Sequence, residues 1–328
     1  RLSKKINYQN FKTIAMINTD VLVIGSSAAG LVAATTGKRV YPEKSFTVAT
    51  MMPKTLIPCG IPYVFGTVGK TENDILPAEK MFEMNNINTI HEEVVSINRE
   101  EKTAVTSSGE KIRYDKLVFG TGSLPKKAGW LKGSDMEMVF TVPKNKIYLD
   151  EMQKKLEGCD KIITIGAGFI GVEISDELKK AGKKVTLIEK LPRVLALAFD
   201  EDISTRAEKM LRDRGIDIIT GISVKQIYGD GKAEGVILEN GDKLEADAVI
   251  LSLGYDPNTE LAGRSGVALN ENNCIKVDEY MRTEDPDIFA IGDCAEKRDF
   301  FTRKKCPIML ASTACAEARI GGMNLYQL

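Results

Sequence analysis

A glycine pattern between a strand and a helix limits the folds open to this 328-residue chain. Residues 161–165 form an apolar strand pattern, Gly166-Ala-Gly168-Phe-Ile-Gly171 follows, and residues 172–181 have amphipathic helical spacing. In a dinucleotide-binding fold the first glycine makes the turn, the second lets the backbone approach a pyrophosphate, and the third allows close helix-strand packing. The pattern therefore predicts a parallel α/β unit that presents the N-terminus of a helix to a nucleotide.

The next predicted strand, residues 184–188, ends in Glu189. An acid at this place accepts hydrogen bonds from a ribose 2′-hydroxyl and repels a 2′-phosphate, which favours NADH over NADPH. Lys190 and Arg193 lie close enough in the sequence to soften that preference, so NADP(H) stays open.

An earlier glycine turn is less complete. Residues 20–24 form a strand pattern, and Gly25-Ser-Ser-Ala-Ala-Gly30 leads into a helical stretch, residues 31–36, but the middle glycine is replaced by Ser27. The strand at 45–50 ends in Ala49 and Thr50, where an acid would bind the adenosine ribose. A second nucleotide turn is expected here, and a tight turn without a ligand is the competing interpretation.

Further segments complete two α/β units. A strand at 116–119 runs into Gly120-Thr-Gly122, and a strand at 248–253 runs into Gly254. Between these come strand patterns at 216–228 and 236–238, with a hairpin turn at Asn240-Gly241. Near the end, a buried strand within 283–291 leads into Gly292-Asp293-Cys-Ala295, and residues 308–323 form the last expected helix.

A single cysteine lies in the octapeptide Leu-Ile-Pro-Cys59-Gly-Ile-Pro-Tyr63. A buried structural thiol in a turn is one interpretation, because free cysteine often behaves as a small hydrophobe. The other is a reactive thiol: an expected helix start after Cys59 would stabilise its thiolate and lower its pKa. The six cysteines include no Cys-x-x-Cys pair, which is typical of a reduced compartment.

Composition excludes several other functions. The formal net charge of −1 predicts no binding to nucleic acid or to an anionic membrane. His91 is the single histidine and has no partner at a metal-ligand spacing, so no metal is expected. The sequence contains no run of 18 apolar residues, so no transmembrane helix is expected. A cytoplasmic location is the default expectation. Residues 1–15 are interpreted as an extension or an appended segment before Met16.

With its motifs in this order, the chain resembles the FAD-dependent pyridine nucleotide-disulfide oxidoreductases over about residues 17–322. It is most similar to the single-cysteine branch, which holds coenzyme A-disulfide reductases, NADH oxidases, NADH peroxidases and persulfide reductases. The resemblance implies two Rossmann-like domains, with an NAD(H)-binding domain, residues 141–256, inserted in an FAD-binding domain, residues 16–140 and 257–328. That family normally continues into a C-terminal dimerisation domain, whereas this chain stops at Leu328, so a homodimer is expected only if the native protein has that domain.

The resemblance also assigns residues to the two cofactors. For FAD these are Gly25, Ser27, Ala28, Gly30, Thr121, Gly122, Gly292, Asp293 and Ala295, with Asp293 on the ribitol. For NAD(H) they are Gly166, Gly168, Phe169, Ile170, Gly171, Glu173, Glu189 and Gly254, with Glu173 near the nicotinamide.

The implied reaction passes hydride from the nicotinamide to the flavin and electrons on to sulfur through Cys59, the catalytic thiol. Val64 stands where the two-cysteine branch has its second cysteine, and Ala28 stands where peroxidases of the family have a histidine. A small disulfide, persulfide or polysulfide is therefore the expected substrate. The alternatives are an NADH oxidase in which Cys59 cycles through sulfenic acid, a flavoprotein reductase of a small redox protein such as rubredoxin, and a redox-sensing module without turnover.

Overall fold

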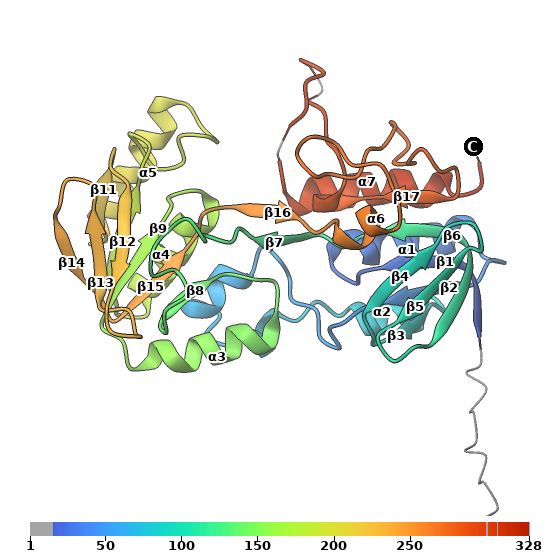
Figure 1. Ribbon diagram of the computed structural model, residues 1–328, viewed down its shortest axis with the longest axis horizontal. Helices are drawn as coiled ribbons and strands as arrows, with labels where there is room; N and C mark the ends of the chain where they lie inside the picture. The colour runs from blue at the N-terminus through green and yellow to red at the C-terminus, as the bar shows by residue number, and fades with distance from the viewer. Residues whose placement is uncertain (1–15, 300, 307, 328) are drawn as a thin grey trace, which may run out of the picture.

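The computed structural model describes residues 16–299, 301–306 and 308–327, so the interpretation of residues 1–15 lies outside the described residues. Figure 1 shows two α/β bodies side by side, with β7 (Ser123–Pro125) and β16 (Tyr255–Pro257) crossing between them. These two strands pair antiparallel, Tyr255 opposite Pro125. The chain therefore leaves the first body and returns to it through adjacent strands.

The first body is built on a seven-stranded sheet in the order β3-β2-β1-β6-β5-β4, with β17 also pairing with β6. β1, β2, β3, β6 and β17 pair in parallel, whereas β4 and β5 form an antiparallel extension. The bounds of its strands are β1 Ile17–Ile24, β2 Phe46–Ala49, β3 Asn88–Ile90, β4 Val94–Asn98, β5 Thr103–Thr106, β6 Lys111–Phe119 and β17 Ile288–Ala290. β17 thus joins, through β6, the sheet that β1 begins, although about 170 residues separate β17 from β6 in the sequence.

The second body has a five-stranded parallel sheet in the order β11-β10-β9-β15-β8 and a three-stranded antiparallel meander, β12-β13-β14. Their bounds are β8 Val139–Thr141, β9 Lys161–Ile165, β10 Lys184–Glu189, β11 Asp217–Thr220, β12 Val224–Tyr228, β13 Gly235–Leu238, β14 Lys243–Glu245 and β15 Ala248–Leu251. The central strands read as continuous buried runs because a parallel sheet is covered on both faces. β15, for example, is buried at all four positions.

Helices cover these sheets. Their bounds are α1 Ala28–Val40, α2 Ala78–Met84, α3 Lys146–Glu157, α4 Phe169–Lys180, α5 Glu201–Asp213, α6 Glu260–Arg264 and α7 Ala311–Asn324, with short 3-10 helices η1 Ile61–Phe65, η2 Thr71–Asp74 and η3 Gly292–Cys294. Helices α1 and α7 lie together on the first sheet in Figure 1. The expected helix at 308–323 starts three residues late, because Leu310 is extended (φ −124°, ψ 139°).

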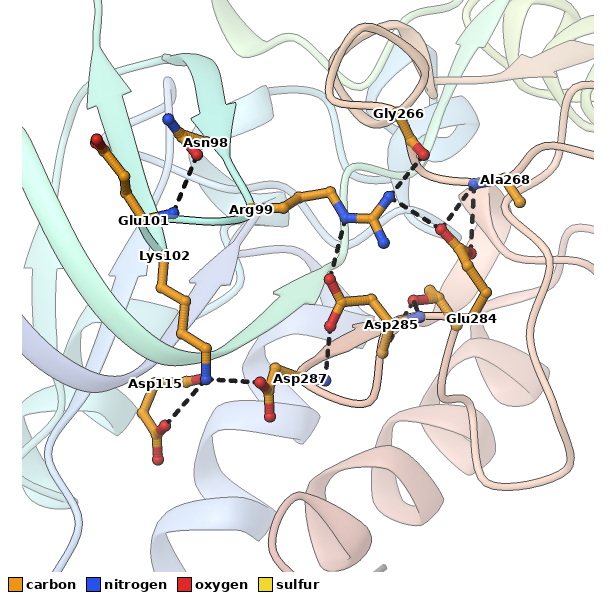
Figure 2. Close-up of polar contacts among 11 residues, drawn as sticks. Asn98, Arg99, Glu101, Lys102, Asp115, Gly266, Ala268, Glu284, Asp285 and Asp287 are labelled. Carbon is orange, nitrogen blue, oxygen red and sulfur yellow. Dashed lines mark hydrogen bonds and ion pairs between the residues drawn. The ribbon is translucent and has the colours of Figure 1, made fainter.

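A charged cluster fastens the two parts of the first body together (Figure 2). Arg99, in the β4–β5 turn, donates from Nε to Asp285 Oδ2 at 3.0 Å and from Nη1 to the carbonyl oxygen of Gly266 at 2.6 Å. The same Nη1 lies 3.1 Å from Glu284 Oε1, whose carboxylate accepts from the Ala268 amide. A planar guanidinium holds several acceptors at once, so Arg99 joins segments more than 160 residues apart in the sequence.

Replacing Arg99 by Ala is expected to lower the free energy of unfolding by about 1–2 kcal/mol, because the change removes the donor to the half-buried Asp285 carboxylate and the contact with Gly266. Urea unfolding measures the loss. Arg264→Ala is the matched control: its ion pair with Glu260 has both side chains more than 60% exposed and should contribute under about 0.5 kcal/mol. Equal effects of the two substitutions would contradict a fastening role for Arg99.

Candidate active site

The first glycine turn has the geometry of a nucleotide-binding turn. Gly25 has φ +110°, and a Cβ on Gly30 would lie 1.8 Å from the carbonyl oxygen of Gly25, so β1 and α1 can approach only with glycine at both positions. Ser27 is the N-cap of α1 but makes no side-chain cap bond, and Ala28 begins a first turn with no acidic residue. The uncapped N-terminus therefore suits a phosphate group, which fits the pyrophosphate of FAD.

A hydroxyl chain lies beside this turn. Ser26 Oγ donates to Thr50 Oγ1 at 2.8 Å and lies 2.7 Å from Thr55 Oγ1. Thr50 directly follows β2, at the place where a ribose-binding acid would stand. Through Ser26 it is joined to the glycine turn and to Thr55, in the segment that leads to Cys59.

At the crossing between the two bodies, Asp293 is held in an ionic cluster that the sequence reasoning did not anticipate. Its Oδ2 accepts from Lys144 Nζ and Ser123 Oγ, both at 2.7 Å. Burial acts to raise the pKa of Asp293, but the Lys144 ammonium and these bonds outweigh it, so the pKa lies below its usual value. A half-buried, charged carboxylate beside Gly292, which has φ +72°, fits the place expected for a ribitol hydroxyl chain.

The remaining residues assigned to FAD come together at the same crossing. Thr121 Oγ1 donates to the carbonyl oxygen of Asn258 at 2.6 Å. A Cβ added to Gly122 would lie 4.0 Å from Lys144 Nζ. Ala295, directly after η3, is buried. Ser123 directly follows the Gly120-Thr-Gly122 motif, whereas Lys144 lies in a stretch for which the sequence predicted no element, so no local pattern identifies either residue.

The second glycine turn repeats the geometry of the first. Gly166 has φ +99°, and a Cβ on Gly171 would lie 1.8 Å from the carbonyl oxygen of Gly166. A Cβ on Gly168 would meet no atom within 4 Å, so this middle glycine faces open space. Close packing at Gly171 with a free approach at Gly168 is the arrangement that a dinucleotide pyrophosphate requires.

Glu189, at the end of β10, faces the same turn. Its Oε2 accepts from the Ala167 amide at 2.7 Å and its Oε1 accepts from the Leu191 amide at 2.9 Å. The carboxylate is thus fixed against the glycine turn, and each oxygen keeps a second lone pair for another donor.

An aromatic pair stands at the start of α4. The rings of Phe169 and Phe199 meet edge to face with centroids 5.8 Å apart, and both side chains are more than 40% exposed. Ile170 is half-buried, and Gly254, with φ +92°, follows β15 at the neighbouring strand end. The residues assigned to NAD(H) therefore gather at the carboxyl ends of β9, β10 and β15.

Cys59 is an exposed thiol in a turn that leads into η1. The prediction of a helix start that lowers its pKa is wrong for the protein alone: η1 is a five-residue 3-10 helix, too short for a strong dipole. Partial desolvation by the surrounding turn and the Glu173 carboxylate raise the pKa of the Cys59 thiol, and Lys144 only partly opposes them. Burial also raises the pKa of Glu173 itself.

The Cys59 segment is packed against the second body. Leu56, Ile61, Val64 and Phe65 belong to the same hydrophobic cluster as the strands of the five-stranded sheet. The buried carboxylate of Glu177 on α4 accepts from the Thr67 amide at 2.5 Å. In Figure 1 the blue segment before α2 lies beside α3 and α4, away from the first sheet.

Helix α3 holds the other end of this segment. Gln153 Nε2 donates to the carbonyl oxygen of Val64 at 2.7 Å, and Lys146 Nζ lies 2.5 Å from Glu72 Oε1. The thiol is therefore carried by a segment that lies between the two nucleotide turns in sequence and is bonded to the helices of the second.

The other five cysteines are buried or half-buried. Cys294 is fully buried, and its Sγ donates toward the carbonyl oxygens of Ile291 and Phe119. Cys315 lies inside α7, with its Sγ 4.0 Å from the carbonyl oxygen of Ala28. Cys59 is the exposed thiol among the six.

The fold and the two turns agree with comparisons to known proteins. The family model described as "Pyridine nucleotide-disulphide oxidoreductase" matches residues 19–318. The chain belongs to this family. It is accordingly an FAD-dependent oxidoreductase that uses a pyridine nucleotide, and the predicted fold of two Rossmann-like domains is confirmed.

Similar members of the family are named for different activities. An NADH oxidase of Enterococcus faecalis is 33% identical over 94% of this chain and 70% of its own length. A CoA-dependent NAD(P)H sulfur oxidoreductase of Pyrococcus abyssi is 30% identical over 95% of this chain and 70% of its own length. The solved NAD-dependent persulfide reductase from A. fulgidus is 33% identical with a TM-score of 0.87, and this oxidoreductase chain covers 59% of that protein and 94% of itself.

In the part of the chain that the structure describes, no helix is long and apolar enough to span a bilayer.

Proposed function

We propose that this oxidoreductase carries electrons from NADH to a small disulfide, persulfide or polysulfide, with Cys59 as the nucleophile. The observation that carries the proposal is the exposed Cys59 thiol on a segment fixed between the two glycine turns. The sulfur-reducing relatives of similar sequence support the same class of acceptor. We also propose that residues 16–140 and 257–328 form the FAD-binding domain and residues 141–256 the NAD(H)-binding domain. A homodimer is proposed for a native protein that has the family's C-terminal domain.

The glycine turns would hold the two nucleotides. Gly25, Gly30 and Asp293 would bind FAD, and Gly166, Gly168 and Glu189 would bind NAD(H). When bound, FAD supplies the two-electron relay between the nicotinamide and sulfur. The fixed carboxylate of Glu189 supports a preference for NADH, since it would repel a 2′-phosphate.

Cys59 would carry the sulfur chemistry. Its thiolate attacks one sulfur of the acceptor, forming a mixed disulfide while the other sulfur leaves with the bonding electron pair and takes up a proton. Among the described residues no second thiol lies in the Cys59 turn, where position 64 is the fully buried Val64. The mixed disulfide therefore has no resolving cysteine in that turn, and bound FAD would supply the electron pair that reduces it.

An NADH oxidase is the second candidate, because the Enterococcus faecalis relative carries that name and an exposed thiol can cycle through sulfenic acid. In that case the acceptor is oxygen.

A panel of acceptors tests the proposal. The flavin-loaded protein is reduced with NADH without oxygen and then mixed with polysulfide, coenzyme A disulfide, oxygen or rubredoxin. We expect reoxidation to be fastest with a sulfur compound, at least about tenfold above oxygen, a difference of about 1.4 kcal/mol in activation free energy. Faster reoxidation by oxygen or by rubredoxin than by every sulfur compound would refute it.

A further inference from the structure

Asp74, the last residue of η2, lies directly against the Cys59 turn. The Ile57 amide donates to the carbonyl oxygen of Asp74 at 2.9 Å. An ideal Cβ on Gly60 would lie 1.7 Å from Asp74 Oδ1 and 3.1 Å from Oδ2, so the carboxyl occupies the place of the missing side chain. The residue after Cys59 must therefore be glycine for this carboxyl to pack where it does.

The Asp74 side chain is buried, and one of its two carboxyl oxygens lacks a partner within the described part of the chain. The residue is 4% exposed, and its Oδ2 has no hydrogen-bond partner among the described residues. A buried carboxylate that lacks donors is strongly disfavoured relative to the neutral acid. Burial accordingly raises the pKa of Asp74 to about 6.

Few other charges act on this pair. Besides partial desolvation, Glu173 from α4 raises the pKa of the Cys59 thiol, Lys144 from the β8–α3 connection lowers it, and Asp74 and the Cys315 thiol of α7 raise it further. Glu72, on the same short helix as Asp74, is paired with Lys146. Among residues 16–299, 301–306 and 308–327, no basic side chain forms an ion pair with Asp74, so its charge acts on the thiol without being neutralised.

We propose that Asp74 is a positioning residue that sets the proton occupancy of Cys59: the charged carboxyl holds the thiol protonated, and the neutral carboxyl lets the thiolate form more readily. This inference rests on the proposed function only in taking Cys59 as the reacting group. Its consequence is protection, because a protonated thiol is oxidised slowly between turnovers.

The sign of the effect depends on pH. Below about pH 6 Asp74 is neutral and adds no charge, whereas above about pH 6 it is ionised and suppresses the thiolate. A plot of the logarithm of the Cys59 alkylation rate against pH should therefore have two parallel rising arms, with the arm above pH 6 offset downward. Coupled groups titrate in this linked way.

The test is alkylation of the flavin-loaded full chain by iodoacetamide from pH 5 to pH 9, followed by mass spectrometry of the Cys59 peptide. In Asp74→Asn the permanent loss of charge should leave rates near pH 5 unchanged and raise rates at pH 7.5 by roughly 3- to 10-fold. Structural loosening would instead raise the rate by a similar factor at every pH.

Asp150→Asn is the matched control, because Asp150 bonds Thr71 and Lys146 and so supports the same segment without facing the thiol. It should give no pH-dependent change. A pH-independent effect of Asp74→Asn, or none, overturns the proposal; if that variant does not fold, a single straight arm in the wild-type profile overturns it. The measurement uses neither NADH nor a sulfur acceptor, so a failure of the acceptor panel leaves its outcome unaffected.

Discussion

Cys59→Ser is expected to reduce NADH-dependent sulfur reduction by roughly 10³-fold or more, since removing a nucleophile eliminates the covalent route. The hydroxyl of serine cannot replace a thiolate at neutral pH. The fold should be unaffected, because the Cys59 side chain is exposed and its turn is held by backbone bonds and by buried neighbours. Anaerobic reduction of the bound flavin by NADH should proceed at the wild-type rate, which separates loss of the thiol from loss of cofactor binding.

Cys306→Ser is the matched control for this experiment. Cys306 is a half-buried thiol whose amide bonds the carbonyl oxygen of Lys297, and no motif assigns it a role. Its replacement should leave sulfur reduction within about twofold of wild type. If Cys59→Ser reduces sulfur compounds as fast as wild type, the thiol mechanism is wrong.

Gly171→Ala is expected to lower the free energy of unfolding by about 3 kcal/mol, because its Cβ would lie 1.8 Å from a backbone oxygen that cannot rotate away. Alanine normally stabilises a helix by about 1 kcal/mol relative to glycine. The steric overlap at position 171 must therefore cost more than this gain for the protein to be destabilised. Urea unfolding of the chain without NADH would measure the net effect.

Gly168→Ala separates packing from nucleotide binding in the same turn. Its Cβ would meet nothing within 4 Å, so stability should change by less than about 0.5 kcal/mol. NADH should nevertheless bind about tenfold more weakly, a loss of about 1.4 kcal/mol, because the methyl group stands where the pyrophosphate approaches. Unchanged NADH affinity in this variant would argue against the assigned nucleotide site.

The two nucleotide turns could be predicted because their geometry requires particular residues. Positive φ at Gly166 and backbone contact at Gly171 exclude side chains, so the chemistry is visible in the sequence itself. Strand β9 has the predicted bounds for the same reason: its buried run ends abruptly at this turn. Helix α5 was not predicted, although Asp200 caps it and its apolar residues recur at helical spacing, so that signal was present.

Contacts between distant segments could not be predicted. Lys144 reaches Asp293 across 149 residues, and no local pattern distinguishes this lysine from the other lysines of the chain. The pKa of Cys59 is likewise raised, contrary to the expected direction, by partial desolvation and by Glu173, which lies more than 100 residues later, with a smaller contribution from Asp74. Such charges act through tertiary packing, which residue spacing does not encode.

The packing of the Cys59 segment against α3 and α4 constrains how the chain folds during synthesis. The Cys59 segment, with the apolar residues Leu56, Ile61 and Phe65, is synthesised well before Glu177, the residue that anchors it. In the same way, β6 is synthesised long before β17, the strand that pairs with its C-terminal half. Apolar side chains of the Cys59 segment therefore remain exposed to solvent while more than 100 further residues are synthesised. The thiol turn is assembled late, and chaperone dependence should concentrate in that interval.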